Sequence, residues 1–191
     1  DQNQLDLVQD GEQTLSLIGQ NGSLNVATVT QSNEAFNIDS ASSALAFVEA
    51  TQVGTNNALT ILQNGAADEF TVRSLTLQNG EDNVITVTQS GTNDQAFIDQ
   101  IGNTNIATVT QNAGGLLNEV DVNQSGNDGF SEMTQSGTEN FAELFQGGSL
   151  NQSYITQDGT LNSASLTQSS SGNFSTITQA GNSGSAIVTQ N

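Results

Sequence analysis

The stretch QIGNTNIATVTQ, residues 100–111, shows the repeating pattern from which the fold can be inferred. Glutamine stands at both ends, eleven residues apart, and the alternate positions before Gln111 hold Asn105, Ala107 and Val109. A period of two is typical of a β-strand whose every second side chain points to the same face. The segment therefore predicts a strand with an inward row of Asn, small, aliphatic and Gln side chains.

The same spacing recurs along the whole chain. Twelve of the fifteen intervals between repeat glutamines are eleven residues, and the others are 21, 15 and 13 residues, with Ser42 at the glutamine position inside the longest. Self-similarity at a fixed period is the signature of a solenoid. The predicted structural glutamine ladder comprises Gln9, Gln20, Gln31, Gln52, Gln63, Gln78, Gln89, Gln100, Gln111, Gln124, Gln135, Gln146, Gln157, Gln168, Gln179 and Gln190.

Other positions of the repeat are ordered too. Glycine stands two residues after the glutamine in twelve of fifteen cases, which indicates a turn because glycine accepts positive φ. Leu, Ile, Val or Met stands two residues before the glutamine or Ser42 in fourteen of seventeen units, and Asn stands six residues before in ten. The predicted structural asparagine ladder comprises Asn25, Asn57, Asn83, Asn105, Asn140, Asn151, Asn162 and Asn173.

Stacking of identical strands explains why amides point inward. Burying an amide without partners costs roughly 1–3 kcal/mol, but strands stacked about 4.8 Å apart let each amide donate to one neighbour and accept from the other. We therefore predict an all-β, two-sided β-solenoid of amyloid-like strand-turn-strand coils, with about seventeen strands of an eleven-residue half-repeat. Residues 1–191 are expected to form one domain, with irregular spacers near 32–51, 64–77 and 112–123.

Composition excludes most chemistries. The chain has no Cys, His, Pro or Trp, one cation, Arg73, and a formal net charge of −19. Without Cys and His, the usual zinc, haem, iron–sulfur and thiol sites cannot be built, so we predict no cofactor, no metal and no enzyme. The charge argues against nucleic acid and anionic membranes, and no run of about 18 apolar residues predicts membrane insertion. Paired carboxylates of a glycosidase, or calcium binding, remain alternatives for the twenty scattered acids.

Several segments resemble the Q-x-G-x-x-N-x-A-x-x-x-Q half of the curlin repeat. Similarity to curlins implies a strand-turn-strand solenoid and secretion of an unfolded chain through an outer-membrane pore, followed by polymerisation at the cell surface into fibres for biofilm and adhesion. It also implies a nucleating minor subunit and export accessory proteins as partners. An exported chain would be numbered from the end of a removed signal. The segments are QNGSLNVATVTQ (20–31), QIGNTNIATVTQ (100–111), QSGTENFAELFQ (135–146) and QDGTLNSASLTQ (157–168).

The first and last units both carry the inward pattern, which predicts a head-to-tail homopolymer because an uncovered end coil recruits another chain. An odd number of strands further suggests that successive subunits are related by about half a turn. The predicted polymer-end strands contain Asn3, Leu5, Leu7 and Gln9 at one end, and Ala186, Val188 and Gln190 at the other.

Outward positions leave further alternatives. Rows of T-x-T on one face resemble the ice-binding face of antifreeze β-solenoids, and the chain could also be the stalk region of a larger adhesin. Arg73 is expected in a local bulge, paired with a neighbouring acid. Six phenylalanines on outward parity could support bundling of fibres, and they are Phe47, Phe97, Phe130, Phe141, Phe145 and Phe174.

Overall fold

The computed structural model describes residues 2–11, 14–35, 46–64, 66–67, 72–112 and 114–191. These residues form strands and turns without any helix, so none of them lies in a helix that could cross a membrane. The strands are β1 (Gln4–Gly11), β2 (Thr14–Ser23), β3 (Val26–Ala35), β4 (Ala46–Thr55), β5 (Ala58–Gln63), β6 (Ala66–Ala67), β7 (Val72–Glu81), β8 (Val84–Gln89), β9 (Gln95–Ile101), β10 (Ile106–Gln111), β11 (Glu119–Ser125), β12 (Phe130–Thr138), β13 (Phe141–Gly147), β14 (Gln152–Thr160), β15 (Ser163–Gln168), β16 (Phe174–Asn182) and β17 (Ser185–Gln190).

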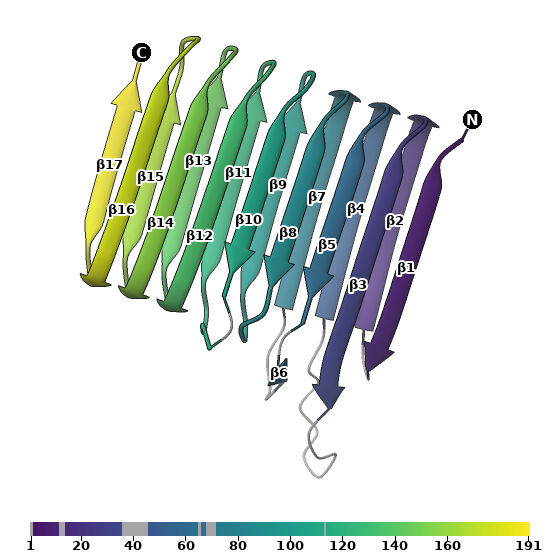
Figure 1. Ribbon diagram of the computed structural model, residues 1–191, viewed down its shortest axis with the longest axis horizontal. Coiled ribbons are helices and arrows are strands. Elements are labelled where there is room, and N and C mark those ends of the chain that lie inside the picture. Colours follow the sequence, from purple (N-terminus) through teal and green to yellow (C-terminus); the bar gives the residue numbers. More distant parts are fainter. Residues whose placement is uncertain (1, 12–13, 36–45, 65, 68–71, 113) are drawn as a thin grey trace.

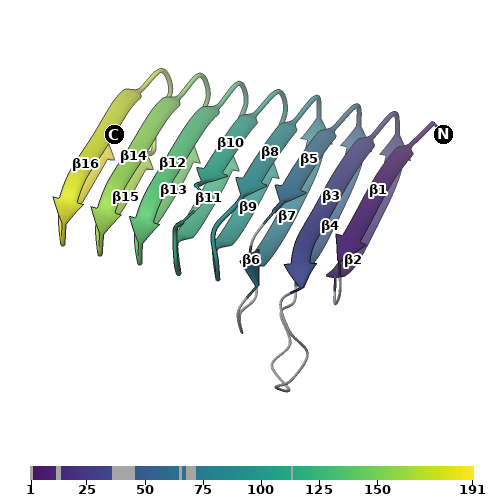
Figure 2. The same ribbon diagram turned by 60° about the horizontal axis from the view of Figure 1, so that its bottom comes forward.

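Successive strands alternate between two parallel sheets (Figure 1). Sheet 1 has the order β1-β3-β5-β8-β10-β12-β14-β16, with β6 beside β3, and sheet 2 has the order β17-β15-β13-β11-β9-β7-β4-β2. Figure 2 shows the two layers facing each other along the whole molecule. The chain therefore winds as a two-sided β-solenoid, which confirms the predicted all-β fold class.

The register of every main strand pair places glutamine opposite glutamine. Gln111 lies opposite both Gln89 and Gln135, and Gln20 lies opposite Gln52, although 32 residues separate the last two along the chain. A slip by one residue would move the whole inward row to the outside. The inward side chains thus set the register, and unequal connections between strands do not disturb it.

The number of strands differs from the prediction of about seventeen repeat units. Each sheet has eight long strands, and β6 has only two residues. The predicted unit around Ser42 lies outside the described residues. Because β4 pairs directly with β2, and β5 with β3, neither sheet has room for another strand at that point. The expected spacers also overlap regular strands, namely β4, β7 and β11.

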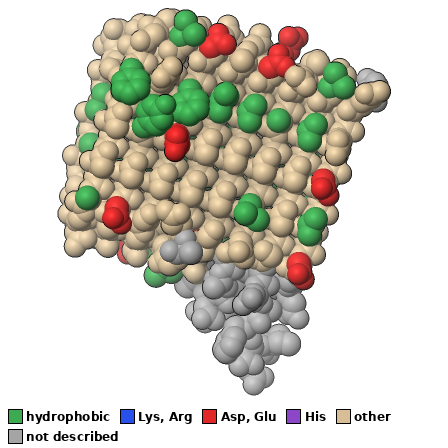
Figure 3. All heavy atoms as spheres, viewed as in Figure 1, with side chains coloured by type: hydrophobic (Ala, Val, Ile, Leu, Met, Phe, Trp, Pro, Cys, Tyr) green, Lys and Arg blue, Asp and Glu red, His purple; other side chains and the backbone are tan. Residues whose placement is uncertain are grey.

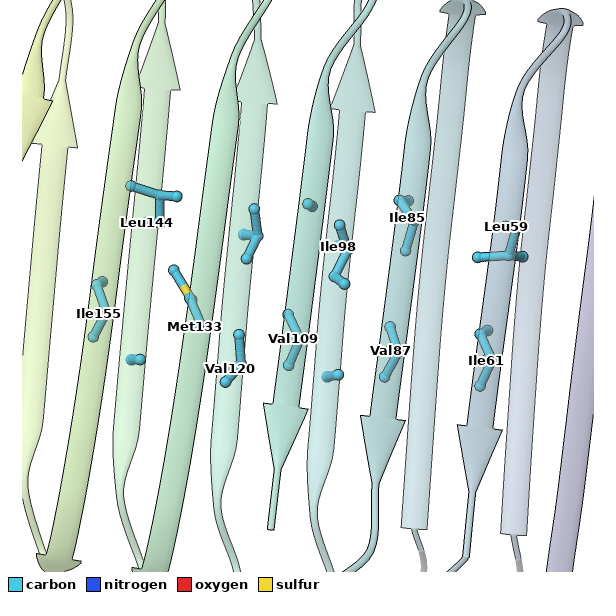
Figure 4. Packing of buried hydrophobic residues seen from close by; sticks show 14 of the residues in the cluster. Leu59, Ile61, Ile85, Val87, Ile98, Val109, Val120, Met133, Leu144 and Ile155 are labelled. Atoms are coloured by element: carbon cyan, nitrogen blue, oxygen red, sulfur yellow. The ribbon is translucent and has the colours of Figure 1, made fainter.

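The core lies between the sheets and consists of alternate residues of each strand. In β10, Ala107 and Val109 are buried, while Thr108 and Thr110 on the other face are half-exposed. Figure 4 shows the aliphatic side chains of both sheets pointing into the space between them. Each fully buried Val, Ile or Leu contributes on the order of 2 kcal/mol through the hydrophobic effect. The aliphatic rows are narrow, so inward polar rows on either side of them complete the interior.

Turns between the sheets stack as closely as the strands. Gly54 has φ 118°, and a Cβ built on it would lie 1.9 Å from the carbonyl oxygen of Gly80 in the next coil. Only glycine fits there, which explains why glycine stands two residues after most repeat glutamines. Leu161, by contrast, adopts φ 57° without being glycine and is half-exposed. The sequence pattern does not reveal this left-handed position.

Candidate functional site: polar ladders and open ends

Glutamine side chains form a continuous ladder in sheet 1. Gln89 Nε2 donates to Gln111 Oε1 over 2.9 Å, and Gln111 Nε2 donates to Gln135 Oε1 over 3.0 Å. Every bond runs in the same direction, from each strand to the next towards the C-terminus. The side chains in this ladder are Gln9, Gln31, Gln63, Gln89, Gln111, Gln135, Gln157 and Gln179.

Sheet 2 carries a second ladder of the same polarity. Gln100 Nε2 donates to Gln124 Oε1 over 2.8 Å, although thirteen residues instead of eleven separate Gln111 from Gln124 in the sequence. The ladder comprises Gln20, Gln52, Gln78, Gln100, Gln124, Gln146, Gln168 and Gln190.

Backbone carbonyls determine the orientation of these amides. Gln111 Nε2 also donates to the carbonyl oxygens of Asn118, at 2.9 Å, and Gln95, at 3.1 Å. A carbonyl oxygen only accepts, so the amide nitrogen must face it, and the amide oxygen is left to face the preceding coil. The polarity of each ladder is therefore a consequence of the strand register.

Asparagines six residues before the glutamines form a second row. In sheet 1, Asn57 Nδ2 donates to Asn25 Oδ1 over 3.1 Å, and Asn83 and Asn105 extend the row. Gly129 interrupts it, but its backbone N–H donates to Asn105 Oδ1 over 2.9 Å. The row resumes with Asn151 and Asn173, which are joined by a bond from Asn173 N to Asn151 Oδ1.

In sheet 2 the corresponding row is shorter and begins with an acid. Asn118 Nδ2 donates to Asp94 Oδ1 over 3.2 Å, and Asn140 Nδ2 donates to Asn118 Oδ1 over 3.1 Å. Asn162 follows, and its Oδ1 accepts from the backbone N–H of Gly184. Asp94 and Asn118 were absent from the predicted ladder, yet each stands six residues before a repeat glutamine, which is the signal that identifies them.

Asp94 is fully buried, with its Oδ1 bonded to Asn118 and its Oδ2 next to Gly91, where no hydrogen bond of good geometry forms. Burial raises the pKa of its carboxyl to about 6, although hydrogen bonds from Asn118 and Gly91 act in the opposite direction. The preceding strand places Val72 at this position, so no amide donates to Asp94 from that side. The Asp94 carboxyl is thus an ionisable group, with fewer hydrogen bonds, in a polar row otherwise made of neutral side chains.

The two ends of the molecule leave complementary groups open. Leu5 and Leu7 point inward from β1 but are 50% and 40% exposed, because no strand covers their outer edge. At the other end Ala186 and Val188 are only half-buried. Among the described residues, the Oε1 atoms of Gln9 and Gln20 receive no amide. The Nε2 atoms of Gln179 and Gln190 bond only to backbone oxygens of Ser163 and Phe174.

Arg73 does not lie in a bulge, and that prediction was wrong. It is part of the regular strand β7, in register with Phe47 of β4 and Gln95 of β9. Its guanidinium lies 5.7 Å from the ring centre of Phe47 and 5.8 Å from that of Phe97. Among the described residues its partners are thus two aromatic faces and no carboxylate, which is a cation–π arrangement.

Acidic side chains gather on the outside of sheet 2. Burial raises the pKa of Asp99, and burial together with the neighbouring charges of Glu143, Asp99 and Glu119 raises that of Asp121. In the part of the chain that the structure describes, no group of three or more acids could hold a metal ion. The sheet therefore presents repulsive negative charge to its surroundings.

Comparison with known proteins agrees with the geometry of the ladders. The model of the curlin associated repeat matches residues 80–112, 137–169 and 159–191, and each stretch contains three repeat glutamines. No curated protein matches the chain. The matched stretches contain β8, β9, β10 and β13 to β17, which are strands of both sheets with the register described above. These stretches of the chain are thus similar to the curlin associated repeat.

Proposed function

We propose that the protein is the structural subunit of an extracellular, curli-like amyloid fibre, formed by head-to-tail stacking of solenoids. The observation that carries the proposal is the complementarity of the two ends. At the N-terminal end of the solenoid, the glutamine oxygens of β1 and β2 have no amide partner among the described residues. At the C-terminal end, the glutamine amide nitrogens of β16 and β17 have spare hydrogens. A second copy placed on the end would continue both ladders.

The junction can be specified residue by residue. β1 of the next copy would pair with β16, so that Gln179 donates to its Gln9, and β2 would pair with β17, so that Gln190 donates to its Gln20. Parallel pairing would also cover Leu5 and Leu7, whose burial stabilises the junction by on the order of 1 kcal/mol each. The contact is heterologous, so growth is open-ended.

Eight full strands in each sheet change the expected symmetry of the fibre. The half turn between subunits was suggested by an odd number of strands, and the described chain has eight long strands in each sheet. Whole coils place sheet 1 of one copy on sheet 1 of the next, related by a rise of about 38 Å at roughly 4.8 Å per strand.

The biological role is part of the same proposal and is supported by the curlin repeats. Curli-like fibres would serve the biofilm matrix and adhesion, outside the cell, in a structural and not an enzymatic role. A nucleating minor subunit could present a strand edge like that of β16 and β17, and export accessory proteins would deliver the chain unfolded.

A pair of end-blocking variants tests head-to-tail growth. Leu7→Lys places a charge on the inward row of β1, and Val188→Lys does so in β17, so each variant keeps one competent end. Neither variant alone should form fibres, and their equimolar mixture should give heterodimers and nothing larger. Val8→Lys, on the outward face of β1, is the matched control and should polymerise.

Electron microscopy and analytical ultracentrifugation distinguish the outcomes. Wild-type fibres should give a cross-β reflection at about 4.7–4.8 Å. Long fibres from Leu7→Lys alone, or wild-type protein that stays monomeric, would contradict the proposal.

A further inference from the structure

The outward faces of the two sheets differ in charge. Three outward rows cross each sheet, at the positions one, three and five residues before each repeat glutamine. From β3 to β16, these rows of sheet 1 carry a single charged residue, Glu132. The same rows of sheet 2 carry one cation and several acids, which are Arg73, Glu49, Asp99, Glu119, Asp121 and Glu143. Within these rows from β3 to β16, negative charge is therefore concentrated on sheet 2, while the other acids of sheet 1 lie at its end strand, as Asp6 and Asp10 of β1, or after the glutamine, as Asp158 of β14.

Sheet 1 also carries an apolar stripe across its strands, five residues before the glutamine ladder. Figure 3 shows this row of hydrophobic side chains crossing the upper part of the face. From β3 to β16 the row has one polar residue, Gln152, and the Tyr154 ring bridges that position, because it lies 5.5 Å from the Phe130 ring and 5.9 Å from the Phe174 ring. The stripe comprises Val26, Ala58, Val84, Ile106, Phe130 and Phe174.

Most of the rest of the face is threonine. Thr88, Thr110, Thr134, Thr156 and Thr178 follow one another in register without interruption. The neighbouring row is threonine from β3 to β10, after which Glu132 and Tyr154 interrupt it. Each threonine offers a methyl group and a hydroxyl at strand spacing. The result is a flat, nearly uncharged surface in a chain with a net charge of −19.

We propose that sheet 1 is the face through which two filaments of this chain pack against each other. The inference rests on the head-to-tail polymer proposed above. A second copy must approach without burying carboxylates, because an uncompensated buried charge is strongly destabilising. Of the two sheet faces, that of sheet 1 comes closer to this condition, because its three outward rows carry two carboxylates, Glu132 and Asp6 of β1, against five on sheet 2.

The area of the face suits a stable interface between copies. Six residues of strand span about 20 Å, and eight strands span about 38 Å, so one copy can cover roughly 750 Å² of its partner. The total of about 1,500 Å² equals that of a standard protein–protein interface. A filament repeats this contact at every subunit, so pairing is multivalent.

The position of the stripe determines the relative direction of the two filaments. It lies near the beginning of the strands and not at their centre. If a twofold rotation about the filament axis related the two filaments, the stripe of one filament would lie against the opposite edge of its partner's face. A twofold rotation about the strand direction instead places the stripe of one filament on the stripe of the other, and threonine rows on threonine rows. This operation reverses the direction of the partner filament. The paired filaments therefore run antiparallel.

A matched pair of charge variants tests the proposal. Thr88→Glu places a carboxylate on sheet 1 between Leu62 and Thr110, and Thr167→Glu places one on sheet 2 in the equivalent row. Both threonines are half-buried by their neighbours. Cryo-electron microscopy should show wild-type and Thr167→Glu filaments paired through sheet 1, and at least about tenfold fewer pairs for Thr88→Glu.

The outcomes separate pairing from polymerisation. Ile106→Glu, in the stripe itself, should also give single filaments, and it replaces Thr88→Glu if that variant does not polymerise. Single wild-type filaments, pairs joined through sheet 2, or parallel pairs would overturn the inference while leaving the polymer intact. A wild-type monomer that shows thermal hysteresis would overturn both proposals and assign the threonine rows to ice.

Discussion

The glutamine and asparagine rows occupy the same interior, but they differ in how many strands carry the residue that defines the row. All sixteen long strands carry a glutamine in register, whereas the asparagine row contains Gly129, Asp94 and Gly184 and does not extend through sheet 2. The hydrogen bonds explain the difference. A glutamine amide is joined to its neighbours through side chains, while an asparagine Oδ1 accepts also from the next backbone N–H, which remains when the next side chain is absent. The bond from one glutamine to the next needs both side chains, and the glutamine row has no gap in the sixteen long strands.

Gln111→Leu should have the largest effect on stability, because it interrupts the glutamine ladder. Leucine removes the acceptor of Gln89 Nε2 and the donor to Gln135 Oε1 and to the Asn118 carbonyl. Each buried group left unpaired costs about 1–3 kcal/mol, so the free energy of unfolding should fall by on the order of 3 kcal/mol. Guanidinium unfolding measures this loss, and fibre assembly followed by thioflavin fluorescence should slow. An unchanged midpoint would mean that the ladder does not stabilise the fold.

Asp94 should make stability depend on pH, through the one titratable member of the polar rows. Its carboxyl pKa is about 6 in the fold, from an ordinary value of 3.8, so the folded state binds the proton more tightly than the unfolded chain. The stabilisation is present below pH 3.8 and is lost as the pH rises through 6. At 1.36 kcal/mol per pKa unit, the loss is about 3 kcal/mol.

Asp94→Asn should remove this contribution to the pH dependence and stabilise the protein at pH 7, while the raised pKa values of Asp99 and Asp121 leave a weaker dependence of the same sign. The exposed Asp158→Asn is the matched control and should leave the dependence in place. Unfolding curves at pH 4 and pH 7 give the comparison, and equal stabilities of the wild-type protein at the two values would refute the assignment.

Asn105→Ala should have a smaller effect than Gln111→Leu in the same strand layer. The backbone N–H of residue 105 still donates to Asn83 Oδ1, but Gly129 N and the Gly126 carbonyl each lose a partner. We expect a loss of about 1–2 kcal/mol in the free energy of unfolding. A loss equal to that of Gln111→Leu would show that the asparagine and glutamine rows stabilise the fold equally.

Thr110→Ser should have the smallest effect, because Thr110 points outward between Thr88 and Thr134. Surface substitutions of this kind change stability by less than about 0.5 kcal/mol. An effect on assembly as large as that of Gln111→Leu would mean that the inward and outward faces have been assigned the wrong way round.

The sequence predicts the fold because each repeat contains the information for one strand and one turn. The period of eleven, the alternation before Gln111 and the glycine two residues after most glutamines were sufficient for the fold class and for the inward rows. Counting residues was less reliable, since the interval from Gln31 to Gln52 indicated an additional strand where β4 pairs directly with β2. Connections can lengthen without changing the register, so their length carries little information.

Other features depend on neighbours across coils and could not be inferred from a single repeat. Arg73 lies between Phe47 and Phe97 only because strands far apart in sequence are stacked. The separation of charge between the two sheets and the stripe on sheet 1 appear only when alternate strands are assigned to opposite faces. The open ends also require the polarity of the ladders, which follows from the contacts between glutamine amides and carbonyls.

Cryo-electron microscopy of the assembled protein tests the central claim most directly. We predict filaments in which subunits repeat with a rise of about 38 Å, sheet 1 stacks on sheet 1, and the glutamine ladder continues from Gln179 to Gln9 of the next copy. A half turn between subunits, a break in the ladder at the junction, or the absence of filaments would contradict the account.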